Sequence, residues 1–201
     1  MTTKPDSIRL NVKFIASAPD LRRAPAPDGP EVAFAGRSNA GKSSVLNQLT
    51  GSRHTAKVSK TPGRTQLLNF FSVAGGGRVV DLPGYGYAKA SRGQQEAWQR
   101  NVNEFLSHRE PLAAVVLVTD IRHPQQPFDM ELLEWANASE LPVLVLLNKA
   151  DKLKRGAQAK ALQAAKRATG EMPLVRVELF SAQNGLGTEP VIEVLRRWFE
   201  T

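Results

Sequence analysis

The sequence predicts a three-layer α/β domain built on a six-stranded, mostly parallel sheet. From residue 31 onward, short apolar segments typical of strands alternate with longer segments typical of helices, which is the usual order in a parallel sheet. Residues 113–118 are apolar throughout, as expected of a strand that helices cover on both faces. Three consecutive glycines at 75–77 lie between two strand-like segments, so they indicate a hairpin and one antiparallel edge strand.

The individual elements follow from these patterns in chain order. The expected strands span residues 31–36, 67–74, 78–82, 112–119, 142–148 and 174–180. The expected helices span residues 42–50, 93–108, 126–139, 155–169 and 188–199. Three tryptophans lie on these helices and are interpreted as packing residues, namely Trp98, Trp135 and Trp198.

The first 29 residues differ in character from the rest. Residues 8–16 alternate apolar and polar side chains, which favours a short extended segment, and a stretch rich in proline follows. We therefore expect an N-terminal extension of residues 1–29, packed on or near a domain of residues 30–201. Within that domain, residues 50–66 show no periodicity and are rich in Lys, Arg, Ser and Thr, which indicates a long loop.

Composition limits the class of protein. The chain has 201 residues, no cysteine, a formal net charge of +8 and a pI near 10. The absence of cysteine excludes disulfides and thiolate metal sites, and the apolar runs are too short to cross a bilayer. No signal-peptide pattern begins the sequence, so a cytoplasmic protein without a membrane partner is expected. The positive charge favours a polyanionic partner such as nucleic acid.

Residues 36–43 match the pattern G-x-x-x-x-G-K-[ST] between an expected strand and an expected helix. In this phosphate loop, glycines let backbone N–H groups approach phosphates, and the helix N-terminus favours anions. Lys42 would neutralise the β- and γ-phosphate oxygens, and the Ser43 hydroxyl would hold Mg²⁺. The candidate phosphate-binding residues are Gly36, Arg37, Ser38, Asn39, Ala40, Gly41, Lys42, Ser43 and Ser44.

Two further motifs follow expected strands. Asp81, Leu82, Pro83 and Gly84 form D-x-x-G, whose Asp reaches Mg²⁺ through water and whose Gly N–H meets the γ-phosphate. Residues 148–151 form N-K-x-D, in which the Asp151 carboxylate accepts two hydrogen bonds that guanine offers and adenine does not. Considered alone, Asp151 could instead be a helix N-cap. The residues of this motif are Asn148, Lys149, Ala150 and Asp151. Ser181 and Ala182 end the last strand, where a backbone N–H could meet guanine O6.

Together these motifs resemble the guanine-nucleotide domain of translation-factor-like small GTPases, a P-loop GTPase fold. Residues 60–71, 81–88 and 120–124, with Asp129 and Trp135, narrow the resemblance to one group. They are similar to the EngB/YihA/YsxC family of ribosome-biogenesis GTP-binding proteins, of the TrmE-Era-EngA-YihA-Septin-like class. One small departure is Asn148, where many members have Thr.

The resemblance implies a slow GTPase that binds GTP and GDP with Mg²⁺, acts as an assembly factor for the large ribosomal subunit, and is linked to cell division and septation. It implies that Thr65 ligates Mg²⁺ and that residues 63–67 close over the γ-phosphate, while Phe180, Ser181 and Ala182 line the base. The closing residues are Gly63, Arg64, Thr65, Gln66 and Leu67. The expected catalytic residues are Lys42, Thr65 and Gly84, the expected metal ligands are Ser43, Thr65 and Asp81, and a monomer is expected.

Two residues bear on the rate of GTP hydrolysis, and one short basic segment bears on the identity of the partner. Tyr85 stands where Ras-type enzymes place a water-orienting glutamine, so slow intrinsic hydrolysis is expected. Asn39 either helps to bind K⁺ near the phosphates, as its counterpart does in related GTPases, or merely fits the loop turn. A basic run, Lys152, Lys154 and Arg155, is either a solvated face or an RNA contact.

Two other classes of protein compete with this interpretation. A metabolic P-loop enzyme such as a nucleotide kinase is disfavoured by the N-K-x-D motif and by the lack of a separate acceptor-binding lid. An RNA-binding module with a vestigial nucleotide site is disfavoured because Lys42, Ser43, Thr65, Asp81 and Asp151 are all intact.

Overall fold

The computed structural model describes residues 9–52, 55, 67–85 and 92–200, and it confirms the α/β fold class. Its strands are β1 (Val12–Ala18), β2 (Glu31–Gly36), β3 (Leu68–Val73), β4 (Arg78–Asp81), β5 (Leu112–Asp120), β6 (Val143–Asn148) and β7 (Val175–Leu179). Its helices are η2 (Leu21–Arg23), α1 (Lys42–Thr50), α2 (Arg92–His108), α3 (Pro127–Ala138), η4 (Ala150–Lys152), α4 (Arg155–Ala168) and α5 (Thr188–Phe199). The expected strands and longer helices agree with these bounds to within one residue at each end.

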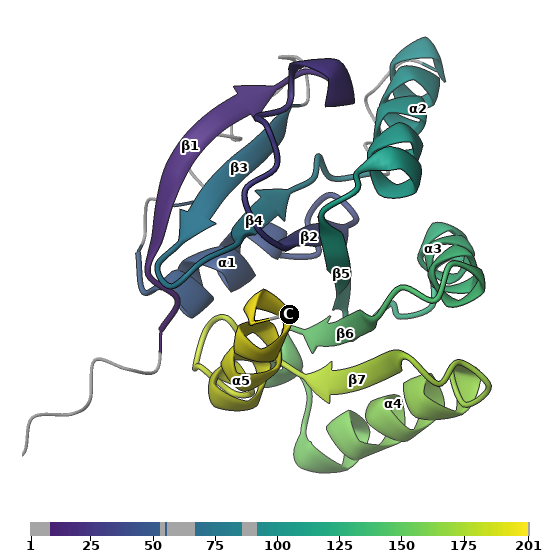
Figure 1. Cartoon of the computed structure of the whole chain (residues 1–201). Coiled ribbons are helices and arrows are strands. Elements are labelled where there is room, and N and C mark those ends of the chain that lie inside the picture. Colours follow the sequence, from purple (N-terminus) through teal and green to yellow (C-terminus); the bar gives the residue numbers. More distant parts are fainter. Residues whose placement is uncertain (1–8, 53–54, 56–66, 86–91, 201) are drawn as a thin grey trace, which may run out of the picture.

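The described residues form a sheet of seven strands in the order β1-β3-β4-β2-β5-β6-β7, which corrects the expected count of six (Figure 1). The additional strand is β1, which pairs antiparallel with β3 from Val12 opposite Val73 to Ala18 opposite Leu68. The hairpin strand β3 therefore lies between β1 and β4, and the edge strand of the sheet that pairs antiparallel with its neighbour is β1. Alternation in residues 8–16 indicated an extended segment, but strand pairing depends on distant residues that local periodicity does not reveal.

Helices cover both faces of the sheet, which explains why the central strands are apolar throughout (Figure 1). On one face, buried side chains of α2, α3 and α4 join a single apolar cluster with β5 and β6. On the other face, α1 and α5 pack against β2, β5 and β6. The apolar side chains that α5 buries are Val191, Ile192, Val194 and Leu195. Parallel central strands covered in this way leave their carboxyl ends free to carry loops.

A buried ion cluster holds the amino end of β2. Glu31 is fully buried, and its two carboxylate oxygens accept hydrogen bonds from Arg109 Nε at 2.8 Å and Arg109 Nη2 at 2.6 Å. Arg78 Nη1 approaches the same carboxylate at 3.5 Å. Because a lone buried charge is costly, this pairing lets Glu31 begin a central strand. The cluster lies at the opposite end of β2 from the phosphate loop.

None of the helices in the described part of the chain is both long enough and apolar enough to span a bilayer.

Candidate nucleotide-binding site

The phosphate loop, residues 36–43, connects the carboxyl end of β2 to the first turn of α1. Gly41 has a φ of +97°, and a Cβ there would lie 2.4 Å from Asn148 Nδ2. Gly36 is equally constrained, because a Cβ would lie 2.4 Å from the Val118 carbonyl oxygen of β5. Both glycines of the sequence pattern are therefore required by close packing as well as by backbone conformation. The loop is held tightly against strands β5 and β6.

Lys42 and Asp81 form a buried ion pair across the sheet. Lys42 begins α1 and Asp81 ends β4, and the lysine ammonium donates to the aspartate carboxylate. The side chains are only 9% and 2% exposed, respectively. Two motifs that are 39 residues apart in the sequence are thereby joined. The pair places one cation and one anion where the phosphate loop meets the end of β4.

Asn148 connects the phosphate loop to the loop at 148–151, which we call the guanine loop. Its side-chain Nδ2 donates to the Ala40 carbonyl at 2.9 Å. Its Oδ1 accepts from the Ala182 backbone N–H at 3.3 Å. A buried amide whose donor and acceptor sides are both used fixes its surroundings. Asn148 therefore positions two loops. The Ala182 N–H, one of the two backbone donors from which a contact with guanine O6 was expected, bonds to Asn148 in this structure.

Lys149 has a left-handed backbone, with a φ of +64°. Its Nζ donates to the Asn39 carbonyl at 2.5 Å and to Asp120 Oδ2 at 2.8 Å. Asp120, at the end of β5, also accepts from Arg122 Nε at 2.9 Å and Nη2 at 2.7 Å. The Arg122 hydrogen bond, with help from Lys149, holds the pKa of Asp120 well below its usual range. Sequence reasoning noted Asp120 within a motif but gave it no role.

Asp151 lies in the short helix η4 and is oriented by Ser181. The Ser181 hydroxyl donates to Asp151 Oδ1 at 2.7 Å, and this bond lowers the pKa of Asp151. The serine is itself held, because its hydroxyl oxygen accepts the backbone N–H groups of Gln183 and Asn184 at 3.2 and 3.3 Å. Asp151 therefore stays ionised with a fixed orientation. It is not the N-cap of α4, since that position belongs to Lys154.

The side chain of Tyr85 does not point toward the phosphate loop. This corrects the interpretation from the sequence, in which the phenol stands in the place of a water-orienting glutamine. Its backbone lies beside the loop, where the Ser38 N–H donates to the Tyr85 carbonyl at 2.7 Å. Its ring turns into the core, is 4% exposed, and packs on Phe128 with a centroid distance of 4.3 Å. The phenol therefore does not occupy the place of a water-orienting glutamine in this structure.

The Tyr85 hydroxyl donates to Asp129, a residue in the first turn of α3 that is 3% exposed. Burial raises the pKa of Asp129 to about 6, although the Gln126 backbone and the charge of Arg37 act in the opposite direction. Arg37, in the phosphate loop, donates to Gln126 Oε1 at 2.9 Å. The phosphate loop, the end of β4 and α3 are thus linked by polar contacts that the sequence patterns did not indicate.

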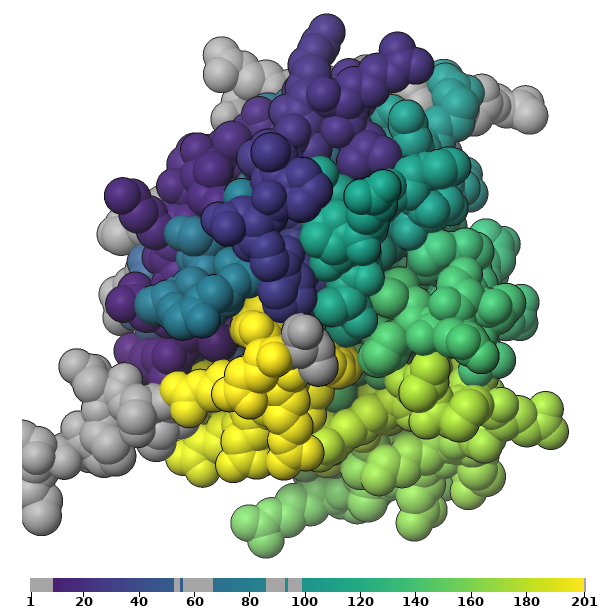
Figure 2. Space-filling view, viewed as in Figure 1, coloured from purple at the N-terminus to yellow at the C-terminus, as the bar shows by residue number. Residues whose placement is uncertain are grey.

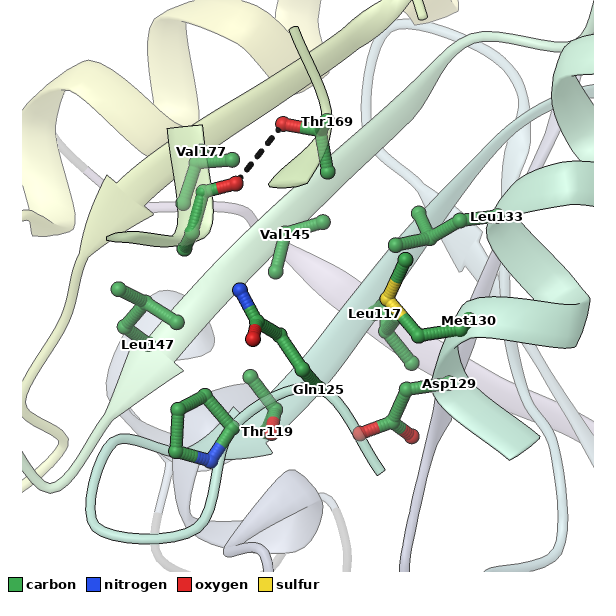
Figure 3. Close-up of a pocket in the computed structure, with 12 residues that line it drawn as sticks. Leu117, Thr119, Gln125, Asp129, Met130, Leu133, Val145, Leu147, Thr169 and Val177 are labelled. Atoms are coloured by element: carbon green, nitrogen blue, oxygen red, sulfur yellow. Dashed lines mark hydrogen bonds between the residues drawn. The ribbon is translucent and has the colours of Figure 1, made fainter. Parts of the chain in front are cut away.

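A small, mostly apolar pocket lies between α3 and α4 and is separate from the loops just described. Figure 3 shows Met130 and Leu133 of α3 on one side and Val177 and Thr169 on the other, with Asp129 at one end. The Thr169 hydroxyl is used within the chain, because it donates to the Ala165 carbonyl at 3.1 Å. The pocket offers no cluster of polar groups that would favour a nucleotide.

The remaining residues that the sequence predicts for the site differ in how far they are buried. Five of them are buried and can offer only backbone groups to a ligand: Ala40, Leu82, Pro83, Ala150 and Phe180. Arg37 and Asn39 are exposed, and Ser44 is exposed on the first turn of α1. Leu67 precedes β3 and is half-buried, and Gly84 lies against the Ser38 backbone. The predictions for Gly63, Arg64, Thr65 and Gln66 lie outside the described residues.

Comparison with known proteins places this site in a family. Residues 31–149 match the family model described as 50S ribosome-binding GTPase. A probable GTP-binding protein EngB of Tolumonas auensis is 50% identical over 192 residues, covering 94% of this chain and 90% of the relative. The relative in Idiomarina loihiensis is 51% identical over 193 residues, covering 94% and 92%. The chain belongs to the EngB family of GTP-binding proteins.

Solved structures support the fold of this EngB-family chain. A crystal structure of a probable GTP-binding protein engB has a TM-score of 0.70 and 23% identity, covering 85% of this chain and 98% of the other. Era, solved with MgGDPNP and part of 16S ribosomal RNA, has a TM-score of 0.62 and 21% identity, covering 86% and 57%. The EngB-family chain is a P-loop GTPase, so the expected enzyme class and family are confirmed.

Proposed function

We propose that this GTPase is a nucleotide-controlled assembly factor for the large ribosomal subunit. The observation that carries the nucleotide part is the rigid connection of the phosphate loop to the guanine loop through Asn148. The ribosomal part is supported by membership of a family whose model is described as 50S ribosome-binding GTPase, and by the net charge of +8. Residues 30–201 form the GTP-binding domain of this proposal, and residues 1–29 form its extension.

The phosphate end of the proposed site rests on the phosphate loop and Asp81. Lys42 neutralises the β- and γ-phosphate oxygens once they replace Asp81 as its partner, and backbone N–H groups of residues 38–44 cradle the phosphates. Ser43 and Thr65 would supply hard oxygen ligands of the kind that Mg²⁺ prefers, and Asp81 would reach the ion through water. Mg²⁺ would neutralise charge on the phosphates as they separate. The Gly84 N–H, next to Ser38, reaches the γ-phosphate.

The guanine end rests on Asp151. Its ionised carboxylate, fixed by the Ser181 hydroxyl at 2.7 Å, accepts the N1–H and N2–H of guanine. Adenine lacks this pair of donors, so it leaves a charged acceptor unsatisfied. In this proposal Phe180, Ser181 and Ala182 line the base. Asn39, exposed with a φ of +68°, is available to bind K⁺ beside the phosphates.

Nucleotide control acts through the segments at residues 51–66 and 84–93. GTP orders these segments through its γ-phosphate, whereas GDP releases them. Residues 53–64 carry several basic side chains, so ordering them favours docking on ribosomal RNA. We place this cycle in the cytoplasm, with the protein acting as a monomer and supporting cell division through ribosome supply.

The guanine assignment is tested with Asp151→Asn. Xanthine carries a carbonyl where guanine has its amino group, so the variant should lose GTP affinity and gain affinity for xanthosine triphosphate. Competition binding measures both changes, and Lys154→Gln, which alters an exposed side chain three residues further along the chain, serves as the control. An unchanged preference for GTP would remove Asp151 from the base site.

The ribosomal assignment is tested by sedimentation with purified small and large subunits. The protein should sediment with large subunits in a non-hydrolysable GTP analogue and should be released in GDP. Binding should weaken steeply with salt, because each phosphate contact releases counterions. Equal association with both subunits, or equal association in both nucleotides, would contradict the proposal.

A further inference from the structure

The surface of α4 carries an unusual concentration of positive charge. Residues 152–170 contain six basic side chains and no acidic one. All six are exposed: Lys152, Lys154, Arg155, Lys160, Lys166 and Arg167. Within the described part of the chain, Lys152 forms an ion pair with Asp151 at 3.2 Å, and no ion pair is found for the other five. We call these six residues the α4 basic face.

Helix stability does not explain where these charges lie. The helix dipole stabilises Lys166 and Arg167 in the last turn. Lys154 and Arg155 lie at the opposite end, where the dipole makes a cation unfavourable. The first turn of α4 has no acidic residue, and Lys154 makes no side-chain cap. The chain therefore keeps cations along the whole helix at a local cost. An external polyanion would offset that cost.

The basic residues of α4 form two rows on its exposed surface. At 100° per residue, Arg155 and Lys166 fall on one line, and Lys160 and Arg167 on another. Ala165 marks the buried side of the helix, 5% exposed against the apolar cluster. From Arg155 to Lys166 the helix rises roughly 16 Å. The exposed residues between the rows are Gly156, Ala159 and Gln163. Two of these three are small, so a phosphate backbone can approach closely.

The neighbouring helix has the opposite charge. Residues 127–141, which include α3, contain acidic residues and no Lys or Arg. Glu131, Glu134 and Glu140 are exposed on this helix and its end. Both helices cover the same face of the sheet, with the apolar pocket between them (Figures 1 and 3). A polyanion attracted to α4 is repelled by α3, so the charge pattern fixes the side from which it can approach.

We propose that the α4 basic face is the surface by which this protein binds the phosphate backbone of ribosomal RNA. This inference rests on the proposed ribosomal function and adds the surface that carries it. The face begins at Lys152, directly after the guanine loop, and α4 runs along strand β7 at the edge of the sheet. Figure 2 shows the segment of α4 at the outer surface of the molecule, along the lower edge of the view. RNA is thereby bound beside the nucleotide and not across it.

The test compares two charge-matched variants of the full-length protein. Lys160→Gln with Arg167→Gln removes the outward row, and Gln keeps helix propensity nearly unchanged. Arg22→Gln with Arg23→Gln removes the same charge from η2, which follows β1 at the opposite edge of the sheet. A third variant, Lys160→Arg with Arg167→Lys, retains the charge of the face. Thermal unfolding and GTP binding are measured for each, so that a folding defect is recognised.

Binding is measured to large ribosomal subunits and to a labelled 20-nucleotide single-stranded RNA between 50 and 300 mM salt. Each phosphate contact on single-stranded RNA contributes about 0.7 to the slope of log affinity against log salt concentration, so the loss of two contacts should reduce that slope by about 1.4. With equal affinities at 1 M salt, this change makes the variant bind roughly 25-fold more weakly than the wild type at 0.1 M salt. The η2 variant and the charge-retaining variant should bind like the wild type. Equal weakening by the α4 and η2 variants would overturn the inference, because net charge alone would then explain binding.

Failure of the inference and failure of the proposed function give different results. If the wild type does not sediment with large subunits, the proposed function fails. If it sediments and the α4 variant sediments equally well with an unchanged salt slope, the function stands and the α4 assignment fails. Vesicles with 30% phosphatidylglycerol form a last arm, and stronger binding to them than to RNA at equal salt would overturn the choice of partner.

Discussion

Substitution of Asp129 allows the effect of burial on the ionisation of one carboxyl group in this fold to be measured. The side chain is 3% exposed in the first turn of α3 and accepts a hydrogen bond from the Tyr85 hydroxyl. Burial raises its pKa from 3.8 to about 6. Asp129→Asn keeps the shape and keeps an oxygen that can accept from Tyr85, but it removes the titration. The variant therefore isolates the free energy of ionising a buried carboxyl.

The direction and magnitude of the pH effect on stability follow from the linkage between proton binding and folding. The folded state holds the proton more tightly than the unfolded state, so the contribution of Asp129 to stability is fully present below about pH 4 and is lost as pH rises through about 6. A difference of about two pKa units corresponds to roughly 3 kcal/mol. The stability of Asp129→Asn relative to the wild type should therefore rise by about 3 kcal/mol between pH 4 and pH 7, and then remain level.

Urea unfolding of both proteins at several pH values between 4 and 8 measures this difference, and other titrating groups cancel because the two chains share them. Glu134→Gln on the same helix is the control, since this side chain is exposed and water solvates its charge. As a substitution of an exposed surface residue, it should change stability by only about 0.5 kcal/mol or less. A flat difference for Asp129→Asn, or one that falls as pH rises, would refute the assignment of Asp129 as a buried and reluctantly ionised group.

Three further substitutions test other contacts. Lys42→Ala removes the cation that pairs with Asp81, so calorimetry should show both GTP and GDP binding about tenfold to hundredfold more weakly; unchanged affinity would exclude Lys42 from the phosphates. Ser181→Ala removes the donor that orients Asp151, so the preference for GTP over ATP should fall by up to about tenfold in competition binding, and an intact preference would contradict that role. Glu31→Gln leaves the Arg109 and Arg78 charges without their buried partner, which should cost about 3–5 kcal/mol in urea unfolding; a loss below 1 kcal/mol would show that the cluster is not needed.

Local sequence patterns predicted the elements well, because strand and helix signals here are carried by neighbouring residues. The phosphate loop, for example, follows from spacing alone, since its glycines and Lys42 are needed at fixed positions on a strand-loop-helix unit. The position of β1 was not predictable in the same way. Val12–Ala18 pairs with Leu68–Val73, more than 50 residues later in the chain, and no periodicity within residues 8–16 specifies that partner.

The polar links of the site were only partly predictable for a related reason. Motif spacing predicted that Asn148 and Asp151 lie at the edge of the sheet where the strands end. It did not predict that the Asn148 side-chain amide forms hydrogen bonds with Ala40 and Ala182. The Ser181 hydroxyl was overlooked because its position in the chain suggested only a backbone role. Asp129 was noted within a motif, yet its meeting with Tyr85 depends on how α3 packs on the end of β4.

Tyr85 bears on two explanations of the slow hydrolysis that the sequence leads us to expect. One explanation is that a phenol stands in place of glutamine and orients water poorly. The structure favours another, in which the Tyr85 ring is packed on Phe128 and its hydroxyl is used by Asp129, so that position 85 offers no side chain to the phosphates. Tyr85→Phe removes only the hydroxyl and separates the two.

If the hydroxyl serves Asp129, Tyr85→Phe should lower stability by about 1.5–3 kcal/mol at pH 8, where the acceptor is charged, and by about 1 kcal/mol at pH 5, where it is mostly protonated. GTP turnover, measured by phosphate release, should stay within about twofold of the wild type. Tyr85→Phe and Asp129→Asn should also be non-additive in stability, because they remove parts of one contact. A tenfold fall in turnover at unchanged stability would instead show that the hydroxyl acts at the phosphates when GTP is bound.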